Sequence, residues 1–227
     1  MTKQYYSVAI DGPAGAGKST MARRAAETLG IVYVDTGAIY RTVAYAVTKK
    51  GIVPTDQAAI AALLPELALE LMWTPDGVQH MILDAQDVTE LIRQPDISQV
   101  ASVVSAIPSV REFLLNTQRD IAKGHSVIMD GRDIGTVVLP EADVKIFLSA
   151  SAEVRAKRRW LQLQAMPRQT SFEEVLQEII ERDNRDTNRA IAPLRPAEDA
   201  VLLDTSNLTL EESVSKILSI IREKTAL

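Results

Sequence analysis

AIDGPAGAGKST, residues 9–20, places three glycines, a proline and a lysine between an apolar run and a stretch rich in helix formers. The pattern G-x-x-x-x-G-K-[ST] of a phosphate-binding loop is satisfied here by Gly12, Gly17, Lys18 and Ser19. The pattern also has the context it requires, since a predicted strand precedes it and a predicted helix follows it. The alternative interpretation of this segment is a glycine-rich turn that has only a structural role and carries a surface lysine.

The composition of this loop suits a nucleotide triphosphate. Glycines adopt positive φ angles and let backbone N–H groups, together with the following helix N-terminus, converge on phosphate oxygens. Lys18 is expected to reach the β- and γ-phosphates and the Ser19 hydroxyl to ligate Mg²⁺. The residues of this segment predicted to bind ATP are Gly12, Pro13, Ala14, Gly15, Ala16, Gly17, Lys18, Ser19 and Thr20.

Composition narrows the class of protein. The chain has 227 residues, 46% of them hydrophobic, a formal net charge of −5 and no cysteine. The absence of cysteine excludes a disulfide framework, thiol catalysis and cysteine-ligated zinc. No stretch approaches the roughly 20 apolar residues that cross a membrane, and the N-terminus lacks a signal-peptide pattern. We therefore expect a cytoplasmic, globular protein that acts neither at a membrane nor on nucleic acid.

Strand and helix patterns alternate along the chain. Short apolar, β-prone runs occur at residues 5–10, 31–34, 126–129, 144–148 and 201–203. Helix-forming stretches separate most of them, the first ending at Gly30. This alternation predicts an α/β fold with a central, mostly parallel five-stranded sheet, helices on both faces, and ligands at the carboxyl ends of the strands.

One segment breaks the alternation. Residues 67–88 contain TPDG between two β-prone runs and a second turn signal in LDAQD. The flanking residues 55–64 and 95–123 have helical character. We expect a small antiparallel β insert on helical stems that leaves the parallel sheet intact.

Four segments resemble the bacterial cytidylate kinases, a family of nucleoside monophosphate kinases. They are DGPAGAGKST from Asp11, DTGAIYR from Asp35, DGRDIGTVVLP from Asp130 and RDNRDTNRAIAPL from Arg182. The resemblance runs over nearly the whole chain, and the β insert resembles that of the bacterial long form. It implies a core of residues 1–35, 108–155 and 190–227, a monophosphate-binding region at 36–107 and a helical lid at 156–171.

The activity that the resemblance implies is Mg·ATP-dependent transfer of a phosphoryl group to CMP and dCMP. Arg41 suits a monophosphate because its planar guanidinium can donate two parallel hydrogen bonds. Asp133 can accept a hydrogen bond from an exocyclic amine such as N4 of cytosine. By resemblance, the CMP site comprises Thr36, Tyr40, Arg41, Ser102, Arg111, Arg132, Asp133, Arg182, Asp186 and Arg189. Asp130 lies at the end of its predicted strand, where a carboxylate can support a bound Mg²⁺ without ligating it directly.

A second cluster of charge follows residue 170. Ser171 and Glu174 have capping-box spacing, and the apolar stripe that follows them continues onto Asp183 and Asp186. Three arginines flank these carboxylates: Arg182, Arg185 and Arg189. The pattern fits a cleft wall that neutralises phosphates, and a solvated, salt-bridged helix face is the alternative. The resemblance implies that the catalytic residues are Lys18, Arg132, Arg182 and Arg189.

The predicted lid carries further arginines. Any of Arg155, Arg158 and Arg159 could close over the triphosphate, and the pattern alone does not decide which faces inward. Of these, Arg158 is the one predicted to bind ATP. Charge neutralisation and exclusion of water are what phosphoryl transfer needs most from such a segment.

Two other functions remain open at this point. A kinase for a different small acceptor, such as another monophosphate or a shikimate-like acid, would keep the loop and the lid. A non-enzymatic ATPase module that binds nucleic acid would use the arginine cluster, although the acidic net charge counts against it. No Asn-Lys-x-Asp run selects guanine, which argues against a GTPase switch. We expect a monomer.

Overall fold

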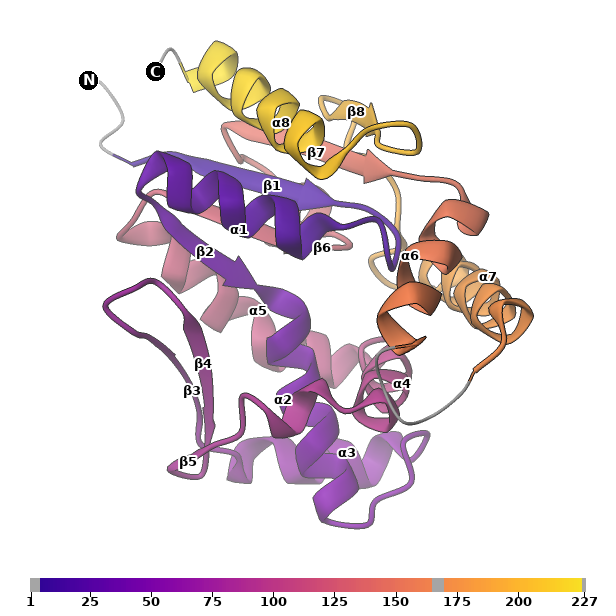
Figure 1. Ribbon diagram of the computed structural model, residues 1–227. Helices are drawn as coiled ribbons and strands as arrows, with labels where there is room; N and C mark the ends of the chain where they lie inside the picture. Colours follow the sequence, from indigo (N-terminus) through magenta and orange to yellow (C-terminus); the bar gives the residue numbers. More distant parts are fainter. Residues whose placement is uncertain (1–4, 165–169, 226–227) are drawn as a thin grey trace.

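The computed structural model describes residues 5–164 and 170–225, and its centre is a five-stranded sheet. The strand order is β2-β6-β1-β7-β8, and every pair of neighbours is parallel. The strands are β1 (Ser7–Asp11), β2 (Val32–Asp35), β6 (Val127–Gly131), β7 (Val144–Ser149) and β8 (Val201–Asp204). The predicted strands and fold class are confirmed (Figure 1).

Helices cover both faces of the sheet. On one face lie α1 (Lys18–Leu29) and α8 (Leu210–Thr225), and on the other lie α2 (Thr36–Lys49) and α5 (Pro108–Lys123) (Figure 1). Side chains alternate between the faces of a strand, so Val8 and Ile10 of β1 enter the core under α1 and α8 while Ala9 enters the other core. β1 is therefore buried on both sides, which accounts for its continuous apolar run.

The insert forms next to strand β2. It is preceded by α3 (Gln57–Leu63) and a 3₁₀ turn η1 (Leu64–Glu66), and it is followed by a 3₁₀ turn η2 (Leu91–Arg93). Between them lies an antiparallel sheet of β3 (Leu69–Trp73), β4 (Gln79–Leu83) and β5 (Gln86–Asp87). The predicted hairpin at TPDG is confirmed, with Gly77 at φ 79°. The second predicted turn adds the short third strand.

The expectation of helix over residues 95–123 needs one correction. The segment forms two helices, α4 (Pro95–Val104) and α5, separated by residues 105–107. Pro108 occupies the first turn of α5, where its missing N–H leaves no hydrogen bond unmade. The break lets α4 pack against α2 while α5 runs under the sheet.

Two helices form an arm at the end of the sheet. They are α6 (Ala152–Gln164) and α7 (Phe172–Asn188), and they share a small apolar core that includes Ala156, Val175 and Ile179. The predicted capping box at Ser171 is confirmed. The rest of the predicted lid loop, residues 165–169, lies outside the described residues. Within the described chain, no helix combines the length and apolar character that crossing a membrane requires.

Candidate active site

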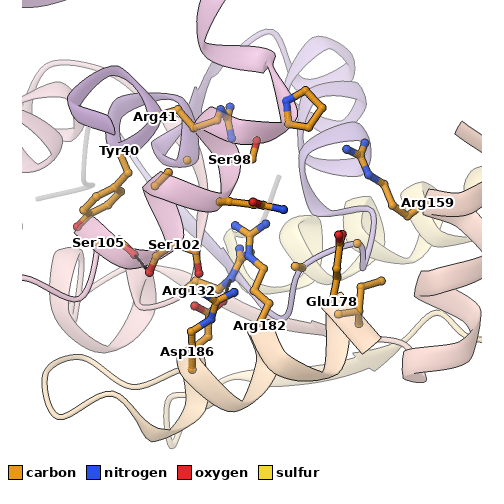
Figure 2. A pocket seen from close by; sticks show the side chains of 18 of the residues that line it. Tyr40, Arg41, Ser98, Ser102, Ser105, Arg132, Arg159, Glu178, Arg182 and Asp186 are labelled. Atoms are coloured by element: carbon orange, nitrogen blue, oxygen red, sulfur yellow. Dashed lines mark hydrogen bonds and ion pairs between the residues drawn. The ribbon is translucent and has the colours of Figure 1, made fainter. Parts of the chain in front are cut away.

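The carboxyl ends of β1, β2 and β6 open into a cleft of about 1550 Å³. Its wall is formed by the loop before α1, by α2 and α4, by residues 130–133 at the end of β6 and directly after it, and by α6 and α7. Figure 2 shows Tyr40 and Arg41 on the α2 side and Arg159 and Glu178 on the side of the α6–α7 arm. A typical single-ligand pocket measures about 300–1,000 Å³, so this cleft has room for two ligands.

The glycine-rich loop has the conformation that its sequence predicts. Gly12, Gly15 and Gly17 have φ angles of 149°, 75° and 84°, in the region that favours glycine. A Cβ atom on Gly12 would lie 1.9 Å from the carbonyl oxygen of Leu148, so only glycine fits between β1 and β7. Of the predicted ATP-binding residues, the cleft lining includes Ala14, Gly15, Gly17, Lys18, Ser19 and Thr20. Gly12, Pro13 and Ala16 do not line it.

Lys18 and Ser19 lie at the base of the cleft. The Lys18 ammonium is buried and donates to the carbonyl oxygen of Pro13 at 2.8 Å. Burial and the nearby Arg132 charge lower the pKa of Lys18 well below its usual value. The Ser19 hydroxyl donates to Oδ2 of Asp130 at 2.9 Å, and the Tyr33 hydroxyl donates to Oδ1 of the same carboxylate at 2.8 Å.

Arg155, one of the three candidate arginines near the predicted lid, points away from the cleft. Its guanidinium is buried and donates to the carbonyl oxygens of Ala14 at 3.0 Å and Ala150 at 2.8 Å. It also forms an ion pair with Asp183, with a nitrogen–oxygen distance of 2.6 Å. Arg155 therefore supports the glycine-rich loop from behind and does not line the cleft. The predicted apolar stripe of α7 thus continues onto Asp183, whose carboxylate pairs with Arg155 of α6.

Arg158 and Arg159 both line the cleft. Nη2 of Arg158 donates to the carbonyl oxygen of Thr205 at 2.7 Å, which ties this side chain to the segment after β8. The arm therefore brings two of the three candidate lid arginines to the same cavity as the glycine-rich loop.

Asp133 lies between two arginines on the opposite side of the cleft. One carboxylate oxygen pairs with Arg111, and the other pairs with Arg189 at 3.2 Å. The Arg111 guanidinium also lies 5.5 Å from the centre of the Tyr40 ring. Four of the residues predicted to bind CMP are therefore in contact, although they come from α2, α5, the loop after β6 and the end of α7.

A further ion pair joins Arg132 to Asp186, with 2.9 Å between Nε of Arg132 and Oδ2 of Asp186 (Figure 2). Although burial opposes ionisation, the charges of Arg132 and Arg182 hold the pKa of Asp186 below its ordinary value. Burial, followed by the Arg132 charge, lowers the pKa of Arg182 to about 10. The positive charge of Arg132 thus disfavours the ionised form of Arg182, and an anion bound beside these two side chains would favour it.

Three residues that line this cleft each carry a buried polar atom with no hydrogen-bond partner among the described residues. These atoms are Nε of Arg41, Oγ of Ser102 and Nε of Arg182. Buried donors are nearly always paired in folded proteins, so these atoms are candidates for hydrogen bonds to water or to a bound ligand. Thr36 also lines the cleft, and its hydroxyl donates to the carbonyl oxygen of Asp130 at 2.7 Å.

Two acidic residues at or next to the site were not singled out by the sequence. Asp35 caps α2 by accepting from the Ala38 N–H at 2.9 Å and pairs with Arg41 at 2.9 Å. Its place before a helix is an N-cap signal that could have identified it. Asp11 accepts from the N–H groups of Ile134 and Gly135, both at 2.8 Å, across 123 and 124 residues of chain. No local pattern indicates that contact.

Comparisons with known proteins give the relatives of this chain. The family model described as cytidylate kinase matches residues 8–223. A cytidylate kinase of Carboxydothermus hydrogenoformans is 50% identical over 217 residues, which is 96% of this chain and 97% of that protein. One of Desulfitobacterium hafniense is 48% identical over 98% of this chain and 95% of its own. A solved structure of an uncharacterized protein from Eubacterium ventriosum has a TM-score of 0.53 at 13% identity, covering 97% of this chain and 99% of that chain, which shows the fold alone.

Proposed function

The chain belongs to the cytidylate kinase family, and on that premise we propose that it transfers the γ-phosphoryl group of ATP to CMP and dCMP. The observation that carries this proposal is the set of unpaired buried atoms on Arg41, Ser102 and Arg182, which lie in one cleft with the glycine-rich loop. The loop offers backbone N–H groups to a polyphosphate, and the unpaired guanidinium nitrogens offer donors to a second anion.

The donor nucleotide occupies the loop side of the cleft in this proposal. Residues 12–20 surround its phosphates, and Lys18 moves from the Pro13 carbonyl to the β- and γ-phosphate oxygens. Ser19 and Asp130 present hard oxygen atoms 2.9 Å apart, which suits Mg²⁺ with Ser19 as ligand and Asp130 behind it. When bound, Mg²⁺ neutralises charge on the transferred group. Arg158 borders the donor from the arm.

The acceptor nucleotide occupies the opposite side. Asp133 accepts from the cytosine amine, and Ser102 and Arg111 complete contacts to the base. Asp186 accepts from the sugar hydroxyls, while Arg41 and Arg132 bind the monophosphate. Tyr40 and Thr36 shape this part of the wall. Each of these side chains lines the cleft, which is the requirement that the proposal places on them.

Transfer then needs no covalent intermediate. An oxygen of the acceptor monophosphate attacks the γ-phosphorus, the bond to the β,γ-bridging oxygen breaks, and ADP leaves with that oxygen. The acceptor phosphate is largely doubly ionised at neutral pH, because its second pKa is about 6, so no general base is required. Arg182 and Arg189 stabilise the charge on the equatorial oxygens in the transition state.

The test is a series of acceptors at saturating Mg·ATP, with ADP formation followed in a coupled assay. The acceptors are CMP, dCMP, UMP, AMP and shikimate. CMP and dCMP should give the highest kcat/KM values because only cytosine presents an amine to Asp133 alongside a pyrimidine ring. Equal or faster turnover of UMP or AMP would reject the assignment, and turnover of shikimate would point to a kinase for another acceptor.

A further inference from the structure

The open edge of the parallel sheet is covered by side chains of the insert. β2 is the edge strand, and it pairs with β6 on one side. On its other side, Nε1 of Trp73 donates to the carbonyl oxygen of Tyr33 at 3.0 Å. The Gln79 carboxamide accepts from the N–H of Asp35 at 2.8 Å and donates to the carbonyl oxygen of Asp35 at 3.3 Å. Figure 1 shows the hairpin β3–β4 beside this strand.

The hairpin delivers these two side chains together. Trp73 and Gln79 are directly opposite each other in the register of β3 and β4, next to the TPDG turn. Gln79 is only 8% exposed, and its amide nitrogen also lies 3.2 Å from Sδ of Met81. Both backbone groups of Asp35 are thus bonded to one amide, in the way that a neighbouring strand would bond them.

Asp35 transmits this contact to the cleft. Its backbone is held by Gln79, and its carboxylate holds the first turn of α2 and the guanidinium of Arg41. Gly37 leaves room for that pair, since a Cβ atom there would lie 3.0 Å from Nη1 of Arg41 and 3.0 Å from Oδ1 of Asp35. The orientation of Arg41 therefore depends on where the two hydrogen bonds from Gln79 hold the backbone of Asp35. Nε of Arg41 is itself buried without a partner among the described residues.

We propose that Gln79 is a positioning residue of the phosphoryl acceptor site. By holding the backbone of Asp35, it orients the Arg41 guanidinium to bind the phosphate of the acceptor. This inference rests on the proposed function. It concerns the phosphate and not the base, because the base contacts proposed above come from Ser102, Arg111 and Asp133, none of which bonds to Gln79 or Asp35 in the hydrogen bonds described.

The test is a double-mutant cycle between Gln79→Met and Arg41→Ala. Methionine keeps the length of the side chain and loses the amide. In the parent enzyme, Gln79→Met should raise the KM for CMP, dCMP and UMP by the same factor, about tenfold, with the KM for ATP changed by less than about twofold. In the Arg41→Ala background, the same substitution should change the KM for CMP by less than about twofold.

Trp73→Phe is the matched control. It removes one hydrogen bond from the same hairpin to the same strand but leaves Asp35 untouched. It should keep the KM for CMP within about twofold of the parent value. If Gln79→Met does not fold, Gln79→Glu takes its place in the cycle, since it keeps the acceptor for the Asp35 N–H.

Three outcomes would overturn the inference. They are additive effects of the Gln79 and Arg41 substitutions, a changed ratio of CMP to UMP turnover in the Gln79 variant, and equal effects of the Gln79 and Trp73 variants. The parent enzyme is assayed with CMP in the same series. Failure of the proposed function would therefore appear in the parent enzyme, whereas failure of this inference would appear only in the variants.

Discussion

The two sides of the cleft are built on different principles. The loop side is centred on one continuous segment, residues 12–20, of which residues 14, 15 and 17–20 line the cleft, and its shape depends on backbone conformation at glycines. The opposite side comes from side chains of α2, α4, α5, the loop after β6, and α7, and its shape depends on the pairing of their charges. Substitutions on the loop side should therefore act through the fold, and those on the opposite side through kinetics.

The largest expected effect is that of Gly12→Ala on the loop side. The new Cβ atom would lie 1.9 Å from the Leu148 carbonyl oxygen at a φ angle of 149°. We expect a loss of at least about 4 kcal/mol in the free energy of unfolding, with loss of ATP binding. Urea unfolding and titration with ATP measure both.

Gly30→Ala is the control for that substitution. Gly30 also has a positive φ angle, 65°, but a Cβ atom added there would meet no described atom within 4 Å outside the adjoining residues and its own helix. Its cost should be about 1–2 kcal/mol, from backbone conformation alone. Equal costs for the two alanine variants would contradict the role of the close approach to β7.

Arg189→Ala should have the next largest effect, on turnover. Arg189 bonds to Asp133 and to the carbonyl oxygen of Ala192, at 3.2 and 2.5 Å, so its guanidinium is fixed in place. Loss of a preorganised cation should lower kcat by about 10²–10³-fold, measured at saturating CMP and ATP. Arg195→Ala makes the same change of charge at an exposed position and should leave kcat near the parent value. A near-normal kcat in Arg189→Ala would show that Arg189 does not stabilise the transition state.

The third prediction concerns pH and Asp11, which joins the end of β1 to the backbone of residues 134 and 135. Burial raises the pKa of Asp11 to about 6 from its ordinary value of 3.8, despite the N–H groups of Gly135 and Ile134. A group whose pKa is raised in the folded state stabilises the fold at low pH, and this contribution is lost as pH rises through the folded pKa.

Asp11→Asn removes this titration and isolates its effect. Between pH 4 and pH 6, the parent enzyme should lose up to about 3 kcal/mol of unfolding free energy relative to the variant. Urea unfolding of both proteins across that range is the measurement. A difference that stays constant with pH would show that Asp11 does not titrate there.

Asp133→Ala should have the smallest effect of the four, and it acts on specificity. We expect the KM for CMP to rise about tenfold and the preference for CMP over UMP to narrow, because the acceptor for the cytosine amine is lost. Asp133→Asn keeps the shape and removes the charge that pairs with Arg111 and Arg189. An unchanged KM for CMP together with an unchanged CMP to UMP ratio would exclude Asp133 from base recognition.

The same contrast explains what could be predicted from the sequence. The loop is local, so its glycines, Lys18 and Ser19 could be read directly together with the strand and helix that flank it. The opposite side is assembled over long separations: Arg132 and Asp186 are 54 residues apart, and Asp133 and Arg189 are 56 apart. Periodicity carries no information on such pairs, and only the resemblance to a family brought the acceptor residues together.

Arg155 shows the limit of reading charge from a helix. Its position among arginines leaves open whether its side chain faces the cleft, and its direction is decided by the packing of α6 against the loop. A Cβ atom on Gly15 would lie 3.3 Å from Cβ of Arg155, so the two segments approach closely, and the guanidinium is taken up by Asp183 and backbone carbonyls. Only the tertiary structure distinguishes this arginine from Arg158 and Arg159.

The strand order has a consequence for the biosynthesis of this enzyme. β1 lies between β6 and β7, and β2 pairs with β6, so the first two strands to leave the ribosome obtain these neighbours only when residues 127–149 have been made. The close contact between Gly12 and the backbone of Leu148 forms at the same late stage. The nascent chain therefore carries its nucleotide-binding segment unassembled through most of translation, and long-range pairing of this kind makes folding slow.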